Sequence, residues 1–143
     1  MTRIAVVGAA GRMGRRLIEL AVEDPEFQVT AAIEAPGHPR LGEPTAAPGV
    51  AIADVCEGDF DVMVEFALPA ATARTLDMAV GSGRPVLIGT TGHSVAQLGA
   101  IRAAARSGGV LKPANTGVGV TLRVQVAGQV GGAWGGAGGG ARR

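Results

Sequence analysis

The sequence has little of what several classes of protein require. Its 143 residues include one cysteine, no tyrosine and 3% aromatic residues, and the formal net charge is +1. The single cysteine, Cys56, excludes an internal disulfide framework, so we interpret it as a small buried or half-buried residue in a reducing compartment. The 13 basic residues are scattered and no aromatic residues are interleaved with them. We therefore expect no nucleic-acid partner.

Long apolar runs are also missing. No apolar stretch reaches the roughly 18 residues that are needed to span a bilayer, and the first residues have the pattern of a strand, not of a cleavable signal. We therefore expect a cytoplasmic protein with no membrane partner, and no residues suggest a metal site. The chain does have 47% hydrophobic residues, over a length that suits one domain with its own core.

The first motif is a Gly-rich loop that lies between an apolar run and an amphipathic stretch. The run at residues 4–7 is followed by Gly8-Ala9-Ala10-Gly11-Arg12-Met13-Gly14, and the amphipathic stretch covers residues 15–22. This order predicts a strand, a phosphate-binding loop and a helix, because glycines let the backbone approach a pyrophosphate at the helix N-terminus. The spacing is GxxGxxG, one residue longer than the common GxGxxG. Taken alone, the loop also fits a tight turn without a ligand.

A second feature favours a dinucleotide site. Residues 28–33 form another apolar run, and it ends at Glu34, which lies 20 residues after Gly14. An acidic residue at about this distance, at the carboxyl end of the second strand, is placed to accept hydrogen bonds from the ribose hydroxyls of an adenosine. Together, loop and acid predict that the chain binds a dinucleotide.

Strand and helix patterns alternate along most of the remaining chain. This alternation predicts an α/β fold, a Rossmann-type doubly wound parallel sheet with helices on both faces. The Pro- and Gly-rich residues 35–49 predict a surface loop. We expect further strands at residues 50–53, 62–66, 85–88 and 108–111, a helix from Pro69 to about Val80, and a helix capped by Ser94 that runs through Ala105.

The pattern changes in the last part of the chain. Residues 123–143 contain about eight glycines and one aromatic residue, Trp134. Ordering a residue costs about 1 to 2 kcal/mol, and this segment has too little apolar surface to offset that cost. We therefore predict a single dinucleotide-binding domain over residues 1–122 and a disordered Gly-rich tail over residues 123–143, in which Trp134 is isolated and exposed.

Four separated segments together resemble one enzyme family. They are GAAGRMG at residues 8–14, VEFALP at 64–69, IGTTG at 88–92 and ANTGVGV at 114–120. In this order they are similar to the amino-terminal, nucleotide-binding half of 4-hydroxy-tetrahydrodipicolinate reductase, also called dihydrodipicolinate reductase, of bacterial lysine and diaminopimelate biosynthesis. The resemblance covers about residues 1–122. It implies an NAD(P)H-dependent oxidoreductase that transfers a hydride to a small dicarboxylate substrate.

The resemblance also implies which residues hold the cofactor. They follow the carboxyl ends of the expected strands, where an open α/β sheet binds its ligands. Gly8, Ala9, Ala10, Gly11, Arg12 and Met13 would hold the pyrophosphate, Glu34 the adenosine ribose, Gly89, Thr90 and Thr91 the nicotinamide side, and Pro113, Ala114, Asn115 and Thr116 the other wall of the cleft. The GTTG segment taken alone suits an ordinary strand-to-helix turn equally well.

The chain departs from the family's pattern near the cofactor. Family members often have Asp-Phe-Thr where this chain has Glu65-Phe66-Ala67, so a hydroxyl is missing near the nicotinamide and the acid is one methylene longer. Members that use NADPH well often carry Arg after the ribose-binding acid, where this chain has Ala35.

This second departure bears on the choice of cofactor. The carboxylate of Glu34 would repel a 2′-phosphate about 4 Å away by about 4 kcal/mol at an effective dielectric constant near 20. A cation from Arg40 or Arg12 would reduce that repulsion. We therefore expect NADH preference, or dual use of NADH and NADPH.

The family's catalytic residues have no counterpart in this sequence. In the family, a carboxyl-terminal domain supplies a His-His-Arg segment with the proton-donating histidine, then a lysine and a Ser-Gly-Thr loop that bind the substrate. His38 lies in the Pro-rich loop, and His93 is expected in the first turn of a helix and exposed to solvent; neither matches the family's catalytic histidine. We therefore expect a truncated or frameshifted member that binds the cofactor without turnover unless a second domain is supplied.

Two alternatives remain open. One is a non-catalytic dinucleotide-binding or regulatory module. The other is a different nicotinamide enzyme of amino-acid metabolism, such as an aspartate or homoserine dehydrogenase, against which the GTTG and ANTGVGV segments count. The sequence does not determine the oligomeric state.

Overall fold

A computed structural model describes residues 1–106 and 108–112 of the chain. Within these residues, six strands form one sheet in the order β3-β2-β1-β4-β5-β6, and neighbouring strands are parallel. The strands are β1 (Thr2–Val7), β2 (Phe27–Ile33), β3 (Ile52–Ala53), β4 (Val62–Glu65), β5 (Val86–Ile88) and β6 (Val110–Leu111). The chain proceeds from β1 outward to β3 and then returns to β4 on the other side of β1, so the order reverses between β1 and β4. This arrangement confirms the expected doubly wound sheet.

Helices cover both faces of the sheet, as the alternation of elements predicts. Successive strand residues point to opposite faces, and the core divides accordingly. Ile4 and Val6 of β1 pack in one apolar cluster with Leu17 and Ile18 of helix α1 (Arg12–Glu23). The alternate β1 residues pack in a second cluster with helices α2 (Thr72–Ser82) and α3 (Val95–Ala105). Residues 4–7 of β1 are buried on both faces, which is why they form a continuous apolar run.

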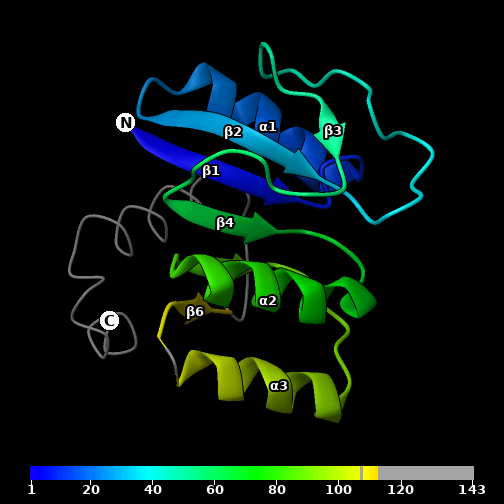
Figure 1. The fold of residues 1–143 in the computed structure, drawn as a ribbon, viewed down its shortest axis with the longest axis vertical. Helices are drawn as coiled ribbons and strands as arrows, with labels where there is room; N and C mark the ends of the chain where they lie inside the picture. The colour runs from blue at the N-terminus through cyan, green and yellow to red at the C-terminus, as the bar shows by residue number, and fades with distance from the viewer. Residues whose placement is uncertain (107, 113–143) are drawn as a thin grey trace.

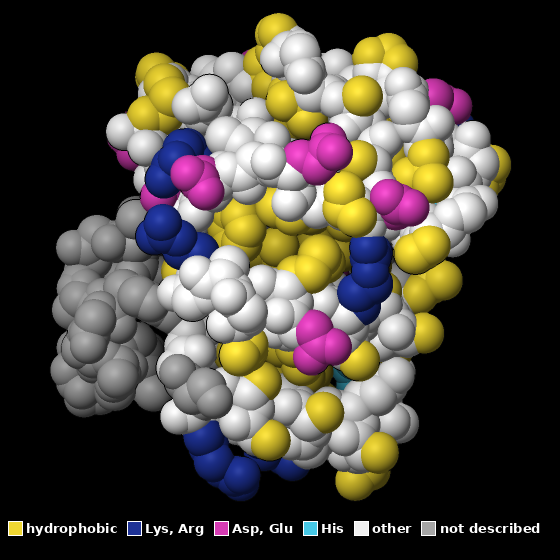
Figure 2. Space-filling view, in the orientation of Figure 1, with side chains coloured by type: hydrophobic (Ala, Val, Ile, Leu, Met, Phe, Trp, Pro, Cys, Tyr) yellow, Lys and Arg dark blue, Asp and Glu magenta, His cyan; other side chains and the backbone are white. Residues whose placement is uncertain are grey.

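The second face is covered by more than its two helices. In Figure 1, α2 and α3 lie over the half of the sheet that contains β4, β5 and β6. Phe60, from the segment before β4, is 6% exposed and packs in the same apolar cluster as α2. Beside it lies a cavity of about 480 Å³ that is lined by Val55, Cys56 and Met78, among others. Figure 2 shows hydrophobic side chains in a hollow on this face, with charged side chains around it.

The boundaries of two helices differ from the expected ones. The helix expected from Pro69 is divided into a 3₁₀ turn, η1 (Pro69–Ala71), and α2, which ends at Ser82. The end of α2 is set by Gly83, which has a φ of 70° and whose N–H donates to carbonyls of the last turn. Left-handed backbone favours glycine, so Gly83 ends the helix. α1 begins at Arg12, three residues before the expected start.

Of the other expectations for the fold, the helix cap is confirmed and the domain end lies outside the described residues. Ser94 caps α3 as predicted, in a capping box with Gln97. The expected domain end at residue 122 and the tail over residues 123–143 lie outside the described residues. In the described part of the chain, no helix combines the length and the apolar character that are needed to cross a membrane.

Candidate functional site

The carboxyl ends of β1, β2, β4 and β5 meet at one cleft. Its volume is about 870 Å³, within the range of roughly 300 to 1,000 Å³ that is usual for sites of small ligands and cofactors. Its lining brings together Gly8, Ala10, Gly11, Arg12, Met13, Glu34, Gly89, Thr90 and Thr91 of the predicted site. Residues 113–116, the predicted opposite wall, lie outside the described residues. The cleft includes the point where the strand order reverses, between β1 and β4.

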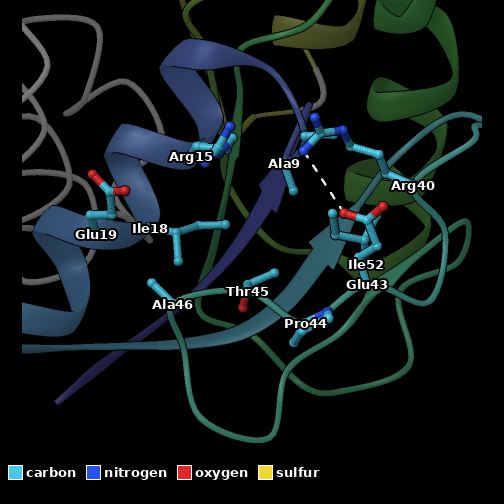
Figure 3. Close-up of a pocket in the computed structure, with 11 residues that line it drawn as sticks. Ala9, Arg15, Ile18, Glu19, Arg40, Glu43, Pro44, Thr45, Ala46 and Ile52 are labelled. Atoms are coloured by element: carbon cyan, nitrogen blue, oxygen red, sulfur yellow. Dashed lines mark ion pairs between the residues drawn. The ribbon is translucent and has the colours of Figure 1, made fainter.

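Ala9 faces the neighbouring cavity. It is 1% exposed and lines a smaller cavity of about 330 Å³ between α1 and the loop after β2 (Figure 3). Arg40 lines both cavities, and its guanidinium lies 3.8 Å from the carboxylate of Glu43. In Figure 3 these two side chains form the ion pair at one end of the smaller cavity.

The three glycines of the loop serve different purposes. Gly8 has a φ of +88°, and a Cβ on it would lie 1.9 Å from the carbonyl oxygen of Phe66. A Cβ on Gly14 would lie 2.0 Å from the carbonyl oxygen of Gly8. Both positions therefore require glycine for packing of the loop against β4 and α1. Gly11 is exposed in the cleft with φ −76°, and a Cβ there would meet only the oxygen of Gly8, at 3.4 Å. Within the described structure, packing does not require glycine at position 11.

The start of α1 has the electrostatic character of an anion site. Gly11 is its N-cap and supplies no side chain to the unpaired N–H groups of the first turn, which contains no acidic residue. The first five residues of the helix instead include Arg12, Arg15 and Arg16. Cations at a helix N-terminus are unfavourable because they add to the positive end of the helix dipole. An anionic ligand in the cleft would offset this arrangement.

Glu34 joins the end of β2 to the Gly-rich loop. Its side chain is 13% exposed, and its Oε2 accepts a hydrogen bond of 2.9 Å from the N–H of Ala10. Its Oε1 accepts from the N–H of Ala35 at 3.3 Å and lies 3.9 Å from Nε2 of His38. The predicted ribose-binding acid is thus held against the loop that is predicted to bind the pyrophosphate.

Helix α2 supplies a wall of the cleft that the sequence analysis missed. Arg74, Thr75 and Met78 of α2 line the cleft, and with Ala71 of the preceding turn η1 they have the spacing of one helix face. Arg74 also donates hydrogen bonds to the backbone carbonyls of Glu34 and Asp54. The spacing could have identified the face, but the same spacing is typical of a helix that packs on a core. Only the position of α2 beside the cleft distinguishes a helix that lines a ligand site from one that packs on the core.

The GTTG segment follows β5 at the other end of the cleft. Its N–H at Gly89 donates to the carbonyl of Glu65 at 2.8 Å, and a Cβ on Gly89 would lie 2.3 Å from the ring of Phe66. Thr90 is 3% exposed, and its Oγ1 accepts from the N–H of Ala67 at 2.9 Å. Thr91 is exposed and lines the cleft. The hydroxyl of Thr90 therefore holds the loop, while that of Thr91 is accessible from the cleft.

The expected solvent exposure of His93 is wrong. α3 begins at Val95, so His93 precedes the helix, and its Nε2 lies 2.7 Å from Oγ1 of Thr72. Nδ1 of His93 is buried without a partner among the described residues. The preceding residue, Gly92, has a φ of +88°. This left-handed turn brings the ring inward, because the chain changes direction before the helix begins.

Glu65 is fully buried at the end of β4, away from the cleft lining. Its Oε1 accepts a hydrogen bond of 2.9 Å from the hydroxyl of Thr72, which is 2% exposed. Its Oε2 has no hydrogen-bond partner in the described part of the chain. Glu65, Thr72 and His93 thus form one hydrogen-bonded chain behind the GTTG segment.

Cys56 is half-buried, as expected, and lies away from this cleft. Burial raises the pKa of its thiol above the ordinary value, and a backbone hydrogen bond with Gly58 opposes the shift. A raised pKa reduces the thiolate fraction and therefore the reactivity of the thiol.

Comparisons with known proteins identify the family of this chain. The family model described as "Dihydrodipicolinate reductase, N-terminus" matches residues 2–116. The 4-hydroxy-tetrahydrodipicolinate reductase of Paraburkholderia phymatum is 34% identical over 132 residues, which cover 87% of this chain and 50% of that protein. The reductase of Alkalilimnicola ehrlichii is 38% identical over 135 residues, which cover 88% of this chain and 51% of that protein. The chain spans about half the length of the curated relatives it matches.

A solved structure supports the same fold. The dipicolinate-bound dihydrodipicolinate reductase from Paenisporosarcina sp. TG-14 aligns with a TM-score of 0.66 at 20% identity, over 90% of this chain and 54% of that one. At this identity the likeness concerns the fold, whereas the family model and the curated relatives carry the assignment by sequence. The chain therefore belongs to the family defined by the amino-terminal domain of dihydrodipicolinate reductase.

Proposed function

We propose that this chain is the cofactor-binding half of an NAD(P)H-dependent 4-hydroxy-tetrahydrodipicolinate reductase. The observation that carries the proposal is the cleft, in which the exposed backbone at Gly11, the uncapped start of α1 and the acidic Glu34 lie together at the strand-order reversal. This is where an open α/β sheet binds a dinucleotide. A bound nicotinamide would supply the hydride for the reduction.

The proposed placement of the cofactor follows the length of the cleft. We place the pyrophosphate at residues 8–13, against the start of α1. Within this loop Ala9 has a structural part, because its N–H donates to the carbonyl of Ile33 at 3.2 Å and it does not line the cleft. Glu34 accepts hydrogen bonds from the adenosine ribose, and residues 89–91 hold the nicotinamide end. The family resemblance assigns the other wall at that end to residues 113–116, which lie outside the described residues.

We further propose that this polypeptide by itself binds the cofactor without reducing the substrate. Among the described residues that line the cleft, the ionisable ones are Arg12, Glu34, His38, Arg40 and Arg74. They belong to the Gly-rich loop, the end of β2 with its following loop, and α2, whereas Gly89, Thr90 and Thr91 carry no ionisable side chain. Lys112, which does not line the cleft, donates from Nζ to the carbonyl of Thr90 at 3.1 Å. We propose that the proton donor comes from a further domain, which also holds the substrate at reacting distance.

NADH is the proposed preferred cofactor, with NADPH as a second. The carboxylate of Glu34 disfavours a 2′-phosphate, and the following residue, Ala35, offers no cation. Arg40 lines the cleft close to this end, but its guanidinium already faces Glu43 at 3.8 Å. Tenfold tighter binding of NADPH than of NADH in calorimetry would contradict this preference.

The proposal is tested with the full chain. NADH binding is followed by the change in nicotinamide fluorescence, and reductase activity is assayed on enzymatically made substrate. Saturable binding without turnover is the expected result. Absence of binding by both NADH and NADPH would overturn the proposed cofactor site, and turnover would overturn the need for a further domain. Tight NADH binding together with no activity after a relative's carboxyl-terminal domain is supplied would favour the non-catalytic module.

A further inference from the structure

The hydrogen-bonded chain Glu65–Thr72–His93 joins two segments that border the nicotinamide end of the proposed site. Glu65 ends β4 and Thr72 begins α2, whereas His93 ends the loop that follows β5. None of the three side chains lines the cleft. These three side chains have no role in the proposed cofactor contacts. One of them, Glu65, is a fully buried carboxyl group, and burying such a group costs free energy unless hydrogen bonds compensate.

With Glu65 as a carboxylate, the proton count of a hydroxyl fixes the direction of both hydrogen bonds. Thr72 Oγ1 has one proton, and it donates that proton to Oε1 of Glu65 at 2.9 Å. The contact of 2.7 Å between Thr72 Oγ1 and His93 Nε2 must then be a hydrogen bond that the imidazole donates. His93 therefore carries a proton on Nε2. The two bonds point in the same direction, toward the carboxylate, so each one polarises and strengthens the other.

The loop after β5 is consequently held at two points. At its beginning, Oγ1 of Thr90 accepts from the N–H of Ala67 at 2.9 Å. At its end, His93 donates to Thr72 at 2.7 Å. Only Thr91 and Gly92 lie between these anchors, and Thr91 is exposed to the cleft. Gly92 has a φ of +88°, so this short segment is a constrained turn.

We propose that Thr72 and His93 are positioning residues for the nicotinamide end of the cofactor site, because they fix the position of Thr91. Glu65 orients Thr72, Thr72 receives His93, and His93 fixes the end of the loop on which Thr91 lies. This inference rests on the proposed cofactor site. The three side chains are proposed to affect one end of the dinucleotide only. Among the described residues, no hydrogen bond links them to the loop at residues 8–13 or to Glu34.

The test compares two ligands on the full chain. NADH occupies the whole cleft, whereas ADP-ribose lacks the nicotinamide and reaches only the pyrophosphate and adenosine parts. In Thr72→Val, which keeps the shape and removes the hydroxyl, the Kd for NADH should rise about tenfold, while the Kd for ADP-ribose should change by less than about twofold. Thr72→Ser restores the hydroxyl and should restore NADH binding. Thr30→Val is the matched control, since among the described residues its hydroxyl donates to the carbonyl of Ile4 alone, at 3.5 Å.

A second variant and a ligand-free measurement complete the test. His93→Ala removes the half-buried end of the chain and should reproduce the selective loss of NADH binding, even where Thr72→Val fails to fold. In ¹H–¹⁵N spectra of the ligand-free protein with a neutral ring, His93 should carry its proton on Nε2. A proton on Nδ1, equal weakening of both ligands, or no weakening of NADH binding would overturn the inference. If the unchanged protein binds neither ligand, the proposed cofactor site itself fails; binding of both with no selective loss rejects the positioning role alone.

Discussion

At the scale of single residues, the glycines of the Gly-rich loop have two different roles, which are packing and access for a ligand. Gly8 and Gly14 are required by backbone atoms that lie about 2 Å from the position of a Cβ. Gly11 has no such neighbour and is exposed in the cleft. A motif of three glycines thus contains two structural residues and one that leaves room for a ligand.

Alanine variants distinguish these roles. Gly11→Ala should fold with a nearly unchanged melting temperature but bind NADH about tenfold more weakly, because its methyl group would lie where a pyrophosphate approaches the backbone. Gly14→Ala should lose stability by several kcal/mol, since the backbone must shift. Gly81→Ala in α2, where a Cβ meets nothing within 4 Å, is the control. Thermal unfolding and fluorescence titration measure both effects; a Gly11→Ala protein that binds normally would contradict the assignment.

Asp61 and Arg3 give a second prediction at this scale. Arg3 donates to both carboxylate oxygens of Asp61, from Nη2 at 3.0 Å and Nε at 3.3 Å, and its backbone N–H donates at 2.8 Å. The side-chain hydrogen bond from Arg3 lowers the pKa of Asp61, and burial partly opposes the shift. Because the pKa is lower in the folded state, the stabilisation is complete above the unfolded value of about 3.9 and is lost as the pH falls through the lower folded value.

Asp61→Asn should therefore reduce this acid-dependent loss of stability. Urea unfolding midpoints of the variant and the unchanged protein should differ above the unfolded pKa and converge below the folded one. Added salt should reduce the difference, because the pair is partly exposed. Asp59→Asn is the control, since the side chain of Asp59 is 86% exposed and 3.9 Å from Arg3. A difference that is independent of pH would show that the ion pair is not its cause.

At the scale of elements, α3 is the helix whose termini matter most. Ile101 is its single fully buried residue, and Leu98 and Ala104 are partly buried against the same apolar cluster. Its start is fixed by the capping box, in which Ser94 Oγ accepts from Gln97 N–H at 3.1 Å and Gln97 Oε1 accepts from Ser94 N–H at 2.7 Å. These two local hydrogen bonds define where the helix begins.

Ser94→Ala removes one side of the box and should lower the free energy of unfolding by about 1 kcal/mol. Ser94→Asp keeps an acceptor at the N-cap and should remain close to the unchanged protein. Urea unfolding followed by circular dichroism measures both. If alanine and aspartate were equally destabilising, the hydroxyl would act through something other than the cap.

At the scale of the whole molecule, the cleft joins the two halves of the sheet. The loop after β1 and the end of β2 belong to one half, and the loop after β5 belongs to the other. A dinucleotide that spans the cleft would contact both halves and bind only the folded state. Binding of this kind stabilises a protein by about 2.7 kcal/mol at a ligand concentration 100 times the Kd.

NADH should therefore raise the melting temperature and slow amide hydrogen exchange in two separated segments at once, residues 8–13 and residues 89–92. ADP-ribose should protect the first segment and leave the second nearly unchanged. Hydrogen exchange with mass spectrometry measures both. Protection confined to the first segment with NADH would place the nicotinamide outside the proposed position.

The sequence by itself determined the order of strands and helices, the doubly wound sheet and the Gly-rich loop, because apolar periodicity, helix caps and turn glycines act over a few neighbouring residues. Ser94 and Gln97 are three residues apart, and their capping box is a local pattern. The family was predicted from four short motifs, because their residues and their order along the chain can be read without any knowledge of tertiary contacts.

Only the tertiary structure decided which residues share a site. The wall formed by α2, the separate roles of Gly8, Gly11 and Gly14, and the inward position of His93 depend on segments that lie far apart in the chain. His93 meets Thr72 across 21 residues of sequence. Such contacts depend on strand pairing and on how helices pack on the sheet, and no local sequence pattern predicts them. The sequence therefore predicted where the cleft lies, whereas the fold determined which contacts hold its walls in place.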